Sequence, residues 1–509
     1  MVHGGLMDKV STLFKWCFLG YLAVLPMSGT IALRNLLLLV LVATVVACLV
    51  LAPKRLMLPV SKGFRLVPWI LILWVLYLLF FPLWAEQPDV AWQNLKGQWI
   101  ESLLAWFVGF GAVLLLGQNG PSLWSLAVAS AFPLAIHLLL LLFGWTGFLG
   151  EGYQSLDTLG AVWHALISQF HAGFEGIGKW RDLPLGFRGV EPMHGNLGYA
   201  ACQAIALFGI CFFTAGREKN QKKLYLAALA IVLCFLSILI ARSRGAVLFA
   251  LLMLLATVAV YRFKWSPAPT THLKVEKSGR LSAKWAIGAI GALCLLVLVA
   301  YQSVKHDTRW HSMVDKVQLG LHLDRPLDIL CEGLPSEVER QIRSGLAGQS
   351  PAYVDDVLEG LKGQDGGRIL LMRAGLDLML ENPNGLDGSR QSYQKLMERK
   401  CGHIPRLHFA HSHQSWIDLS LALGWVGALL FAAVMLYFMR QGWRSMGSSD
   451  FVAFGTALFL ISAFWIARGM VDSVYREHYL QMQAALMAYA YWRIQHAKNV
   501  KTPDTAAIN

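Results

Sequence analysis

Several stretches of this sequence run for about 20 residues with almost no charged side chain, which is the length that a helix needs to cross a bilayer core. The chain is 56% hydrophobic and only 15% charged, whereas about a quarter of the residues in a soluble domain are charged. The ten-residue alternation typical of membrane β-strands is not visible. We therefore predict an all-α polytopic membrane protein. The clearest apolar stretches are 36–52, 66–84, 224–241 and 286–301.

The apolar runs divide the chain into about twelve predicted transmembrane helices. Nine of them fall within residues 1–304, and three fall within residues 413–509, which end in a short polar tail. A long polar segment, 305–412, separates the two groups. The predicted spans are 12–27, 33–52, 66–85, 99–117, 122–145, 195–214, 222–241, 244–262, 285–304, 413–438, 450–469 and 474–494.

Basic residues are unevenly divided between the loops that join these spans. If the N-terminus is cytoplasmic, the short loops on the opposite face contain only Lys96, Arg242 and Arg244. Because cytoplasmic loops carry the excess of Lys and Arg, we expect both termini in the cytoplasm. The net charge of +13 then needs no nucleic acid partner. The basic residues in the cytoplasmic loops would be Lys54, Arg55, Lys62, Arg65, Arg217, Lys219, Lys222, Lys223, Arg262, Lys264, Lys274, Lys277, Arg280, Lys284, Arg440 and Arg444.

Two longer segments are expected outside the cytoplasm. The first, 146–194, is rich in Gly, His and Trp, and the second, 305–412, is the only stretch that resembles a small soluble domain. Within the second we expect a helical insertion, with short helices separated by Gly and Pro and a turn at 381–388. The short helices are predicted at 335–346, 352–361 and 368–380, and a flexible cytoplasmic linker at 265–280.

The most informative stretch runs from His411 to Gly427, at the start of the tenth predicted span. At 100° per residue, Ser420, Gly424 and Gly427 share one helical stripe with His413. Small residues on a membrane helix let a neighbouring helix approach closely, so this stripe turns His413 toward the bundle interior. An ionisable side chain in that position is a candidate functional group.

Two other interpretations of these histidines stay open. His411 and His413 could be interfacial polar residues that cap the entry to a helix. A metal site built from His408, His411 and His413 is disfavoured, because residues i and i+2 diverge on a helix and no nearby carboxylate has an obvious ligand spacing. We therefore predict no metal ligands in this segment.

Several arginines on the same face of the membrane are candidates for binding an anion. Arg242 and Arg244 are wedged between two apolar spans with almost no loop, and a guanidinium group binds phosphate oxygens in a bidentate manner. The alternative is that both side chains snorkel to lipid headgroups. Together, the arginines of this face could form a cationic site opposite His413 that matches a pyrophosphate. The others are Arg188, Arg368 and Arg468.

Two of the eight cysteines, Cys331 and Cys401, lie in the long polar segment. In an oxidising compartment such a pair usually bridges, so we predict a disulfide; the alternative is two free buried thiols. The other six cysteines fall within apolar spans, where a small buried hydrophobe is the simplest interpretation. No cysteine spacing typical of zinc sites occurs.

Nucleotide-dependent chemistry has no support in the sequence. We find no Walker A loop, no dinucleotide fingerprint and no serine nucleophile elbow. ATP-driven transport and serine hydrolysis are therefore poorly supported, and we expect neither a nucleotide nor another cofactor.

The histidine segment resembles the signature of the O-antigen ligase (Wzy_C-like) superfamily. That pattern is a His, then Asn, Ser or Gln, then nine residues and Gly-x-x-Gly, and it is met here by His413, Gln414, Gly424 and Gly427. Members also carry an Arg that opens a helix followed by an Asn-Pro-x-Gly turn, and a Ser-Arg-Gly at the head of a span. The matching residues are Arg368, Asn382-Pro-Asn-Gly385 and Ser243-Arg244-Gly245, so the resemblance covers about 190–470.

The resemblance implies a GT-C-like membrane fold in the bacterial inner membrane, with the active site facing the periplasm. It implies metal-independent, inverting transfer of a glycan from undecaprenyl pyrophosphate to a sugar hydroxyl of lipid A–core, with membrane lipids around the protein. His413 would take the proton of the acceptor hydroxyl, and arginines would stabilise the leaving pyrophosphate. The substrate-binding residues would be Arg188, Arg242, Arg244, Arg368, His411 and Arg468.

Three rival functions stay open. A protein O-oligosaccharyltransferase and an O-antigen polymerase belong to the same superfamily. A glycolipid transporter or flippase would also need basic residues in the membrane, but it should place them near the bilayer midplane, often at broken helices. The candidate residues here cluster at the ends of predicted spans, which favours an enzyme.

Overall fold

The computed structural model describes residues 2–27, 29–51, 67–149, 159–173, 194–265, 312–363, 365–447, 451–475 and 477–501, together with positions 53, 56, 298 and 301. Most of these residues are helical and none of them is in a β-strand. The chain is an all-α polytopic membrane protein, as predicted. The predicted ninth span at 285–304 and the linker at 265–280 lie almost entirely outside the described residues.

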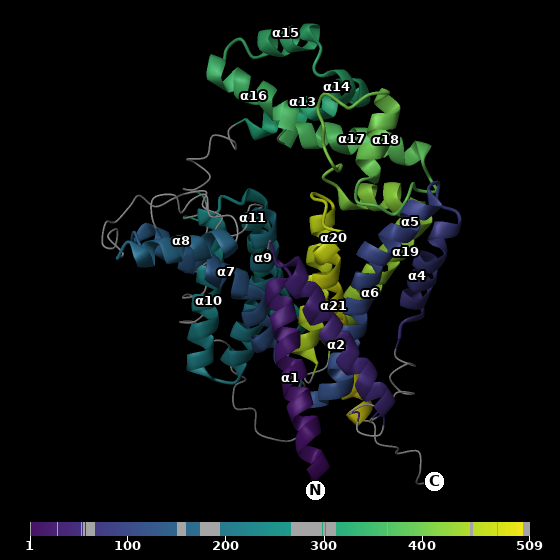
Figure 1. Cartoon of the computed structure of the whole chain (residues 1–509). Helices are drawn as coiled ribbons and strands as arrows, with labels where there is room; N and C mark the ends of the chain where they lie inside the picture. The colour runs from purple at the N-terminus through teal and green to yellow at the C-terminus, as the bar shows by residue number, and fades with distance from the viewer. Residues whose placement is uncertain are drawn as a thin grey trace.

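Long helices form a bundle that makes up the lower part of the molecule in Figure 1. Among the described residues, eight helical segments are long and apolar enough to cross a membrane, and Trp69–Leu83 is a shorter apolar segment. These nine segments lie at predicted spans two to eight, ten and eleven. The helices of this part are α1 (Val2–Val24), α2 (Ile31–Leu51), α4 (Trp69–Phe80), η2 (Phe81–Leu83), α5 (Pro88–Asn94), η3 (Leu95–Trp99), α6 (Ile100–Leu116), η4 (Gly117–Asn119), α7 (Leu123–Trp145), α8 (Leu159–His171), α9 (His194–Arg217), α10 (Gln221–Ile240), α11 (Arg244–Lys264), α19 (Ser415–Ser445), α20 (Val452–Gly469) and α21 (Glu477–Lys501).

The first and last predicted spans correspond to α1 and α21, which are not among the eight segments long and apolar enough to cross a membrane. α1 carries Asp8, Lys9 and Lys15. α21 packs against α6 and α20, and nearly all of its side chains from Tyr479 to Ile494 are buried. A helix covered by protein on all sides does not need a lipid-facing surface, so the polar side chains of α21 are compatible with a place inside the bundle.

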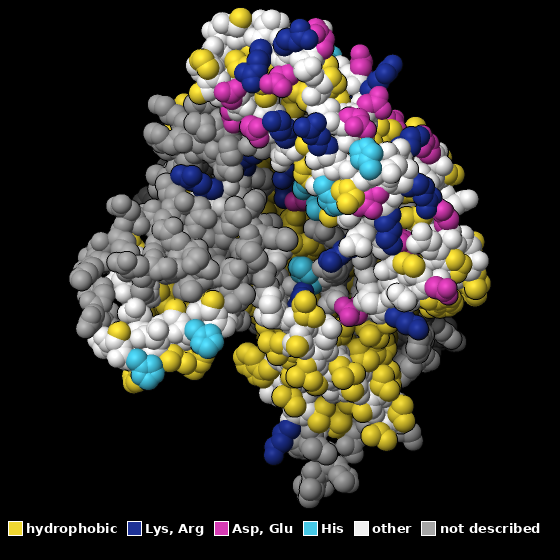
Figure 2. Space-filling model, turned by 45° about the horizontal axis from the view of Figure 1, so that its top comes forward, with side chains coloured by type: hydrophobic (Ala, Val, Ile, Leu, Met, Phe, Trp, Pro, Cys, Tyr) yellow, Lys and Arg dark blue, Asp and Glu magenta, His cyan; other side chains and the backbone are white. Residues whose placement is uncertain are grey.

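A second layer of short helices covers one end of the bundle, opposite the end where α1 begins and α21 ends (Figure 1). Charged side chains gather over this layer in Figure 2, whereas hydrophobic side chains cover the flank of the bundle below it. The layer has its own apolar core, and Ile417 and Leu421 of α19 belong to that core. The helices are α13 (Met313–His322), α14 (Pro326–Glu332), α15 (Ser336–Gly345), α16 (Pro351–Gly363), α17 (Asp365–Glu381) and α18 (Ser392–Cys401), of which α15 to α17 match the three predicted short helices.

The turn after α17 docks its backbone against a break in α19. Gly424 has a non-helical backbone inside α19, with φ 76° and ψ 171°. The N–H of Trp425 donates a hydrogen bond of 2.9 Å to the carbonyl of Pro383, and a β-carbon on Gly424 would lie 2.6 Å from the carbonyl carbon of Asn384. Only glycine combines this φ with so close an approach. Two further backbone hydrogen bonds of 2.9 Å join Leu386 to Leu421 and Gly388 to Ala422.

Cys331, in α14, and Cys401, at the end of α18, are joined by a disulfide, with their Cα atoms 5.4 Å apart. The bridge spans 70 residues of sequence, and closing a loop of that length stabilises the folded state by about 4 kcal/mol in the chain-entropy model. It ties the last helix of the layer to the second.

We expect Cys331 and Cys401 to resist alkylation until a reductant is added. Purified protein should be denatured and treated with a maleimide, with and without prior reduction, and the modified cysteines should be counted by mass spectrometry. The count should rise by two after reduction. A count that does not depend on reductant would contradict the bridge.

Candidate functional site

His413 lies before α19 rather than on it. α19 begins at Ser415 with Gln414 as its N-cap residue, whose side chain accepts a hydrogen bond of 2.9 Å from the N–H of Ile417. His413 itself has a left-handed backbone, with φ 57°. Such a conformation is uncommon outside glycine and is concentrated at functional sites.

The prediction that His413 shares a helical stripe with Ser420, Gly424 and Gly427 is therefore wrong. His413 precedes the helix, and the non-helical backbone of Gly424 interrupts the phase on which the stripe depends. Gly424 and Gly427 serve close contacts instead, because β-carbons there would meet the backbone of Asn384 and the ring of Tyr77. A strained loop residue held by neighbouring turns, not helical periodicity, sets the position of the imidazole.

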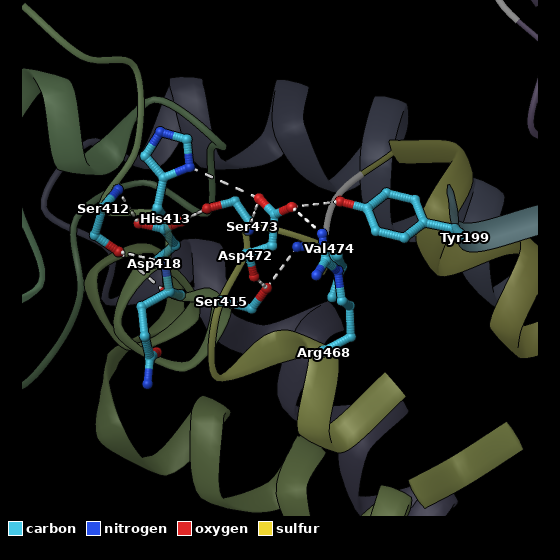
Figure 3. Close-up of polar contacts among 10 residues, drawn as sticks. Tyr199, Ser412, His413, Ser415, Asp418, Arg468, Asp472, Ser473 and Val474 are labelled. Carbon is cyan, nitrogen blue, oxygen red and sulfur yellow. Dashed lines mark hydrogen bonds and ion pairs between the residues drawn. The ribbon is translucent and has the colours of Figure 1, made fainter. Parts of the chain in front are cut away.

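The imidazole of His413 faces the carboxylate of Asp472, in the turn between α20 and α21. Nδ1 of His413 lies 3.7 Å from Oδ1 of Asp472, which is longer than a hydrogen bond. Figure 3 shows the other ring nitrogen on the side away from Asp472. The two side chains are about four-fifths buried. One ring nitrogen is thus turned to a carboxylate, and the other points away from it.

The other oxygen of Asp472 is held by two donors. Nη2 of Arg468 and the hydroxyl of Tyr199 both donate to Oδ2, each at 2.8 Å, while the N–H of Ser473 donates to Oδ1 at 2.9 Å. Burial alone would raise the pKa of Asp472, but the neighbouring His413, the charge of Arg468 and the Tyr199 hydroxyl hold this pKa well below its usual value. Asp472 is therefore a carboxylate at any physiological pH.

Arg468 is buried in a closely packed site at the end of α20. Its guanidinium carbon lies 5.2 Å from the ring centroids of both Tyr199 and Phe249, an arrangement that favours a cation. A β-carbon on Gly245 would come within 2.7 Å of Nη1 of Arg468. The glycine of Ser243-Arg244-Gly245 therefore leaves room for this guanidinium.

Side chains at the start of α19 fix the two segments that carry His413 and Asp472. The hydroxyl of Ser415 donates to the carbonyl of Asp472 at 2.6 Å. The carboxylate of Asp418 accepts a hydrogen bond of 2.9 Å from the N–H of Ser412 and another from the hydroxyl of Ser473 (Figure 3). Neither the segment that carries His413 nor the turn that carries Asp472 can shift without breaking these bonds.

Arg244, the first residue of α11, forms an ion pair with Asp365, the first residue of α17. Nη1 and Nη2 of Arg244 lie 3.0 and 3.4 Å from the two oxygens of Asp365, and both side chains are about one-fifth exposed. The pair joins the bundle to the overlying layer. The carboxylate presents two oxygens to the guanidinium fork, as a phosphate group does.

The remaining predicted arginines are more loosely placed. Arg368 lies on α17, one turn after Asp365, and is exposed. Arg242 is also exposed and has a left-handed backbone, with φ 52°. Arg188 lies outside the described residues. Arg468 and Arg244 are thus the two predicted arginines that the described structure places in built, partly buried surroundings.

His411 lies beside His413 although the two are only two residues apart. Their ring centroids are 4.4 Å apart, because the chain here is not helical and His413 has a left-handed backbone. One ligand atom from each of His411, His413 and Asp472 can be chosen so that all three lie within 4.8 Å of one another. The two imidazoles therefore do not diverge, as residues i and i+2 would on a helix. His408, the third histidine of the metal site that the sequence disfavoured, is exposed.

A small pocket opens beside His411. Its wall combines polar groups with aromatic rings, and the lining residues come both from the layer of short helices and from the bundle. The polar lining includes Gln98, Ser389, Arg390, His411, Asp418 and Ser473, and the aromatic lining Trp99 and Tyr475.

Asp472, Tyr199 and Asp365 carry no sequence motif that would single them out. One signal was present for Asp472: it follows Arg468 by four residues at the end of an apolar span, a spacing at which a carboxylate compensates an arginine on a helix. Tyr199 and Asp365 reach the site from α9 and α17, so only the tertiary structure reveals them.

Comparison with protein families identifies one part of the chain. Residues 229–432 match the model of a family described as O-antigen ligase. The match contains Arg242, Arg244, Arg368, His411 and His413, and it ends before Arg468 and Asp472. A comparison with curated proteins finds no match.

Proposed function

Starting from the O-antigen ligase domain at residues 229–432, we propose that this membrane protein transfers a glycan from undecaprenyl pyrophosphate to a sugar hydroxyl of lipid A–core. The transfer is inverting and uses no nucleotide. The observation that carries the proposal is the pairing of His413, which lies within the matched residues, with the ionised carboxylate of Asp472, which follows them. The reaction takes place on the periplasmic face of the bacterial inner membrane.

His413 acts as the general base in this proposal. With Nδ1 facing Asp472, Nε2 accepts the proton of the acceptor hydroxyl as the oxygen attacks the sugar carbon that bears the pyrophosphate. The bond from that carbon to the phosphate oxygen breaks, and the pyrophosphate leaves with the bonding pair. Asp472 stabilises the imidazolium that forms, and Arg468 and Tyr199 keep Asp472 in place. A positioned base of this kind contributes about 10²- to 10⁴-fold in rate.

Arginines stabilise the charge that develops on the leaving group. Arg244 is the best placed, because its guanidinium already holds two oxygens of Asp365. We propose that the donor pyrophosphate takes the place of this carboxylate, so that Asp365 guards Arg244 until the donor binds. Arg368, on the same helix as Asp365, joins it, and Arg188 and Arg242 assist. Cations that are already in position stabilise the charge of the transition state well, because they need no reorganisation during the reaction.

We expect Arg244→Ala and Arg368→Ala to raise the KM for the lipid-linked donor by about 10- to 100-fold, since a charge-assisted hydrogen bond contributes about 1.5–3 kcal/mol. Lysine should restore only part of the affinity, because it lacks the bidentate fork. Initial rates over a range of donor concentrations measure the effect. Arg340→Ala, which removes an exposed arginine paired with Glu337, is the matched control. Equal KM values for all these variants would contradict the donor site.

The acceptor is tested by direct reconstitution. Purified full-length protein is mixed with lipid-linked glycan and either lipid A–core or a pilin-like protein, without nucleotide. Glycan should appear on lipid A–core. Glycosylation of the protein acceptor instead would reassign the enzyme to the O-oligosaccharyltransferases, and elongation of the lipid-linked glycan alone would reassign it to the polymerases.

We also expect the segment 305–412, which contains the layer of short helices, to face the periplasm and both termini to face the cytoplasm, as the distribution of basic residues indicates. A reporter that is active only in the periplasm should work when fused near Gly360 and fail when fused near Thr270. The reverse pattern would place the candidate site on the wrong side of the membrane for a periplasmic donor.

A further inference from the structure

We propose that His411, His413 and Asp472 form a binding site for a divalent transition-metal ion such as Zn²⁺, and that the bound ion inhibits the enzyme by occupying the catalytic imidazole. The three side chains offer ligand atoms that all lie within 4.8 Å of one another. The inhibitory consequence rests on the proposed function, whereas binding of the ion does not.

The donor set suits zinc. Two imidazoles and one carboxylate are the ligands of several open zinc sites, in which a fourth position holds water. With zinc–ligand bonds of about 2.0–2.1 Å, the ligand atoms of a tetrahedral site lie about 3.4 Å apart. Nδ1 of His413 and Oδ1 of Asp472 lie 3.7 Å apart, which is too long for a hydrogen bond and close to that separation. Nδ1 of His413 is also buried and makes no hydrogen bond.

The contacts of Asp472 leave its Oδ1 open toward His413. Arg468 and Tyr199 both engage Oδ2 of Asp472, so Oδ1 keeps a lone pair on the side of His413 in addition to the one that accepts from Ser473. Backbone geometry brings the imidazoles together, with ring centroids 4.4 Å apart. Hydrogen bonds from Ser412 and Ser473 to Asp418 hold both segments in place, so the ion finds a largely preformed site.

Metal binding and base catalysis exclude each other at His413. A neutral imidazole carries one proton and one free lone pair. When the lone pair of one nitrogen binds a metal, the proton stays on the other nitrogen, and the ring can no longer accept a proton. The bound ion therefore inhibits even if both substrates still fit, and a chelator restores activity.

Binding is measured first, without substrates. Purified full-length protein in detergent is titrated with Zn²⁺ against a chelating dye. The wild type should bind one more equivalent of Zn²⁺ than the His411→Ala/Asp472→Asn double variant does. His403→Ala, which removes an exposed histidine paired with Glu332, should bind as the wild type does. Size-exclusion profiles check that each variant is folded, and a second variant, His411→Gln, keeps the volume of the side chain while removing the imidazole. An equal stoichiometry in wild type, double variant and His411→Gln would overturn the site.

Inhibition is measured second, as the ratio of transfer rates with and without Zn²⁺ for each variant. Transfer by the wild type and by His403→Ala should fall at least tenfold and recover with chelator, whereas the ratio for His411→Gln should stay near one, whatever its zinc-free rate. Stimulation by Zn²⁺, or equal inhibition of His411→Gln, would overturn the inhibitory role. If no transfer is found under any condition, the proposed function fails, but the binding experiment still decides the metal site.

Discussion

His413→Ala should lower the rate of glycan transfer by about 10²- to 10⁴-fold, because the acceptor hydroxyl would lose the base that we propose takes its proton. His413 lies in the loop before α19 and pairs with Asp472 at 3.7 Å, which is longer than a hydrogen bond, so thermal unfolding and the KM for the donor should change little. Single-turnover rates with lipid-linked glycan and lipid A–core measure the effect. The loss should be in kcat.

His411→Ala is the matched comparison for this substitution. It removes the neighbouring imidazole, whose ring centroid lies 4.4 Å from that of His413, but leaves the pairing of His413 with Asp472. Its transfer rate should fall less than that of His413→Ala. Should His411→Ala be inactive and His413→Ala active, the two histidines would have to exchange roles.

Asp472→Asn should lower both stability and activity, although it keeps the shape of the side chain. The buried guanidinium of Arg468 would lose its anionic partner, which costs about 3–5 kcal/mol when one member of a buried ion pair is removed. Transfer should also fall by about 10²-fold or more, because the imidazolium of His413 loses its stabilising charge. Chemical denaturation and transfer assays at neutral pH measure the two effects.

The stability difference has a defined pH dependence. The folded state lowers the pKa of Asp472, so the carboxylate stabilises the fold wherever it is ionised in the unfolded chain, above about pH 4. The difference between wild type and Asp472→Asn should therefore be constant from neutral pH down to about pH 5 and should shrink at more acidic pH. Asp328→Asn, at an exposed pair with Arg325, should change stability little at any pH. A similar loss for both variants would show that Asp472 has no special place.

Helical content and most spans follow from the sequence because each depends on local composition. A run of 20 apolar residues has few alternatives to a membrane helix, and the short helices α15 to α17 are bounded by Gly and Pro. α21 is a more polar helix than the apolar rule predicts, since burial inside the bundle removes its need for an apolar surface. The segment 285–304 stays a prediction.

The candidate site was predictable only in part. His413 and Arg244 are marked by their motifs, and Arg468 by its place at the end of a span. The orientation of His413 was not predictable, because helical phase does not extend to a residue with a left-handed backbone before the helix starts. Asp472, Tyr199 and Asp365 approach from other helices, and their contacts depend on how α9, α17, α20 and α21 pack.

The docking of the 382–385 turn into the break of α19 has a consequence for engineering. The two segments meet backbone to backbone at Gly424 and Asn384, with no side chain between them that could be trimmed to absorb a misfit. A chimera that exchanges the helical layer with that of a relative should therefore take both segments from the same parent. Splitting them between parents would shift the loop that carries His413, even when every candidate active-site residue is retained.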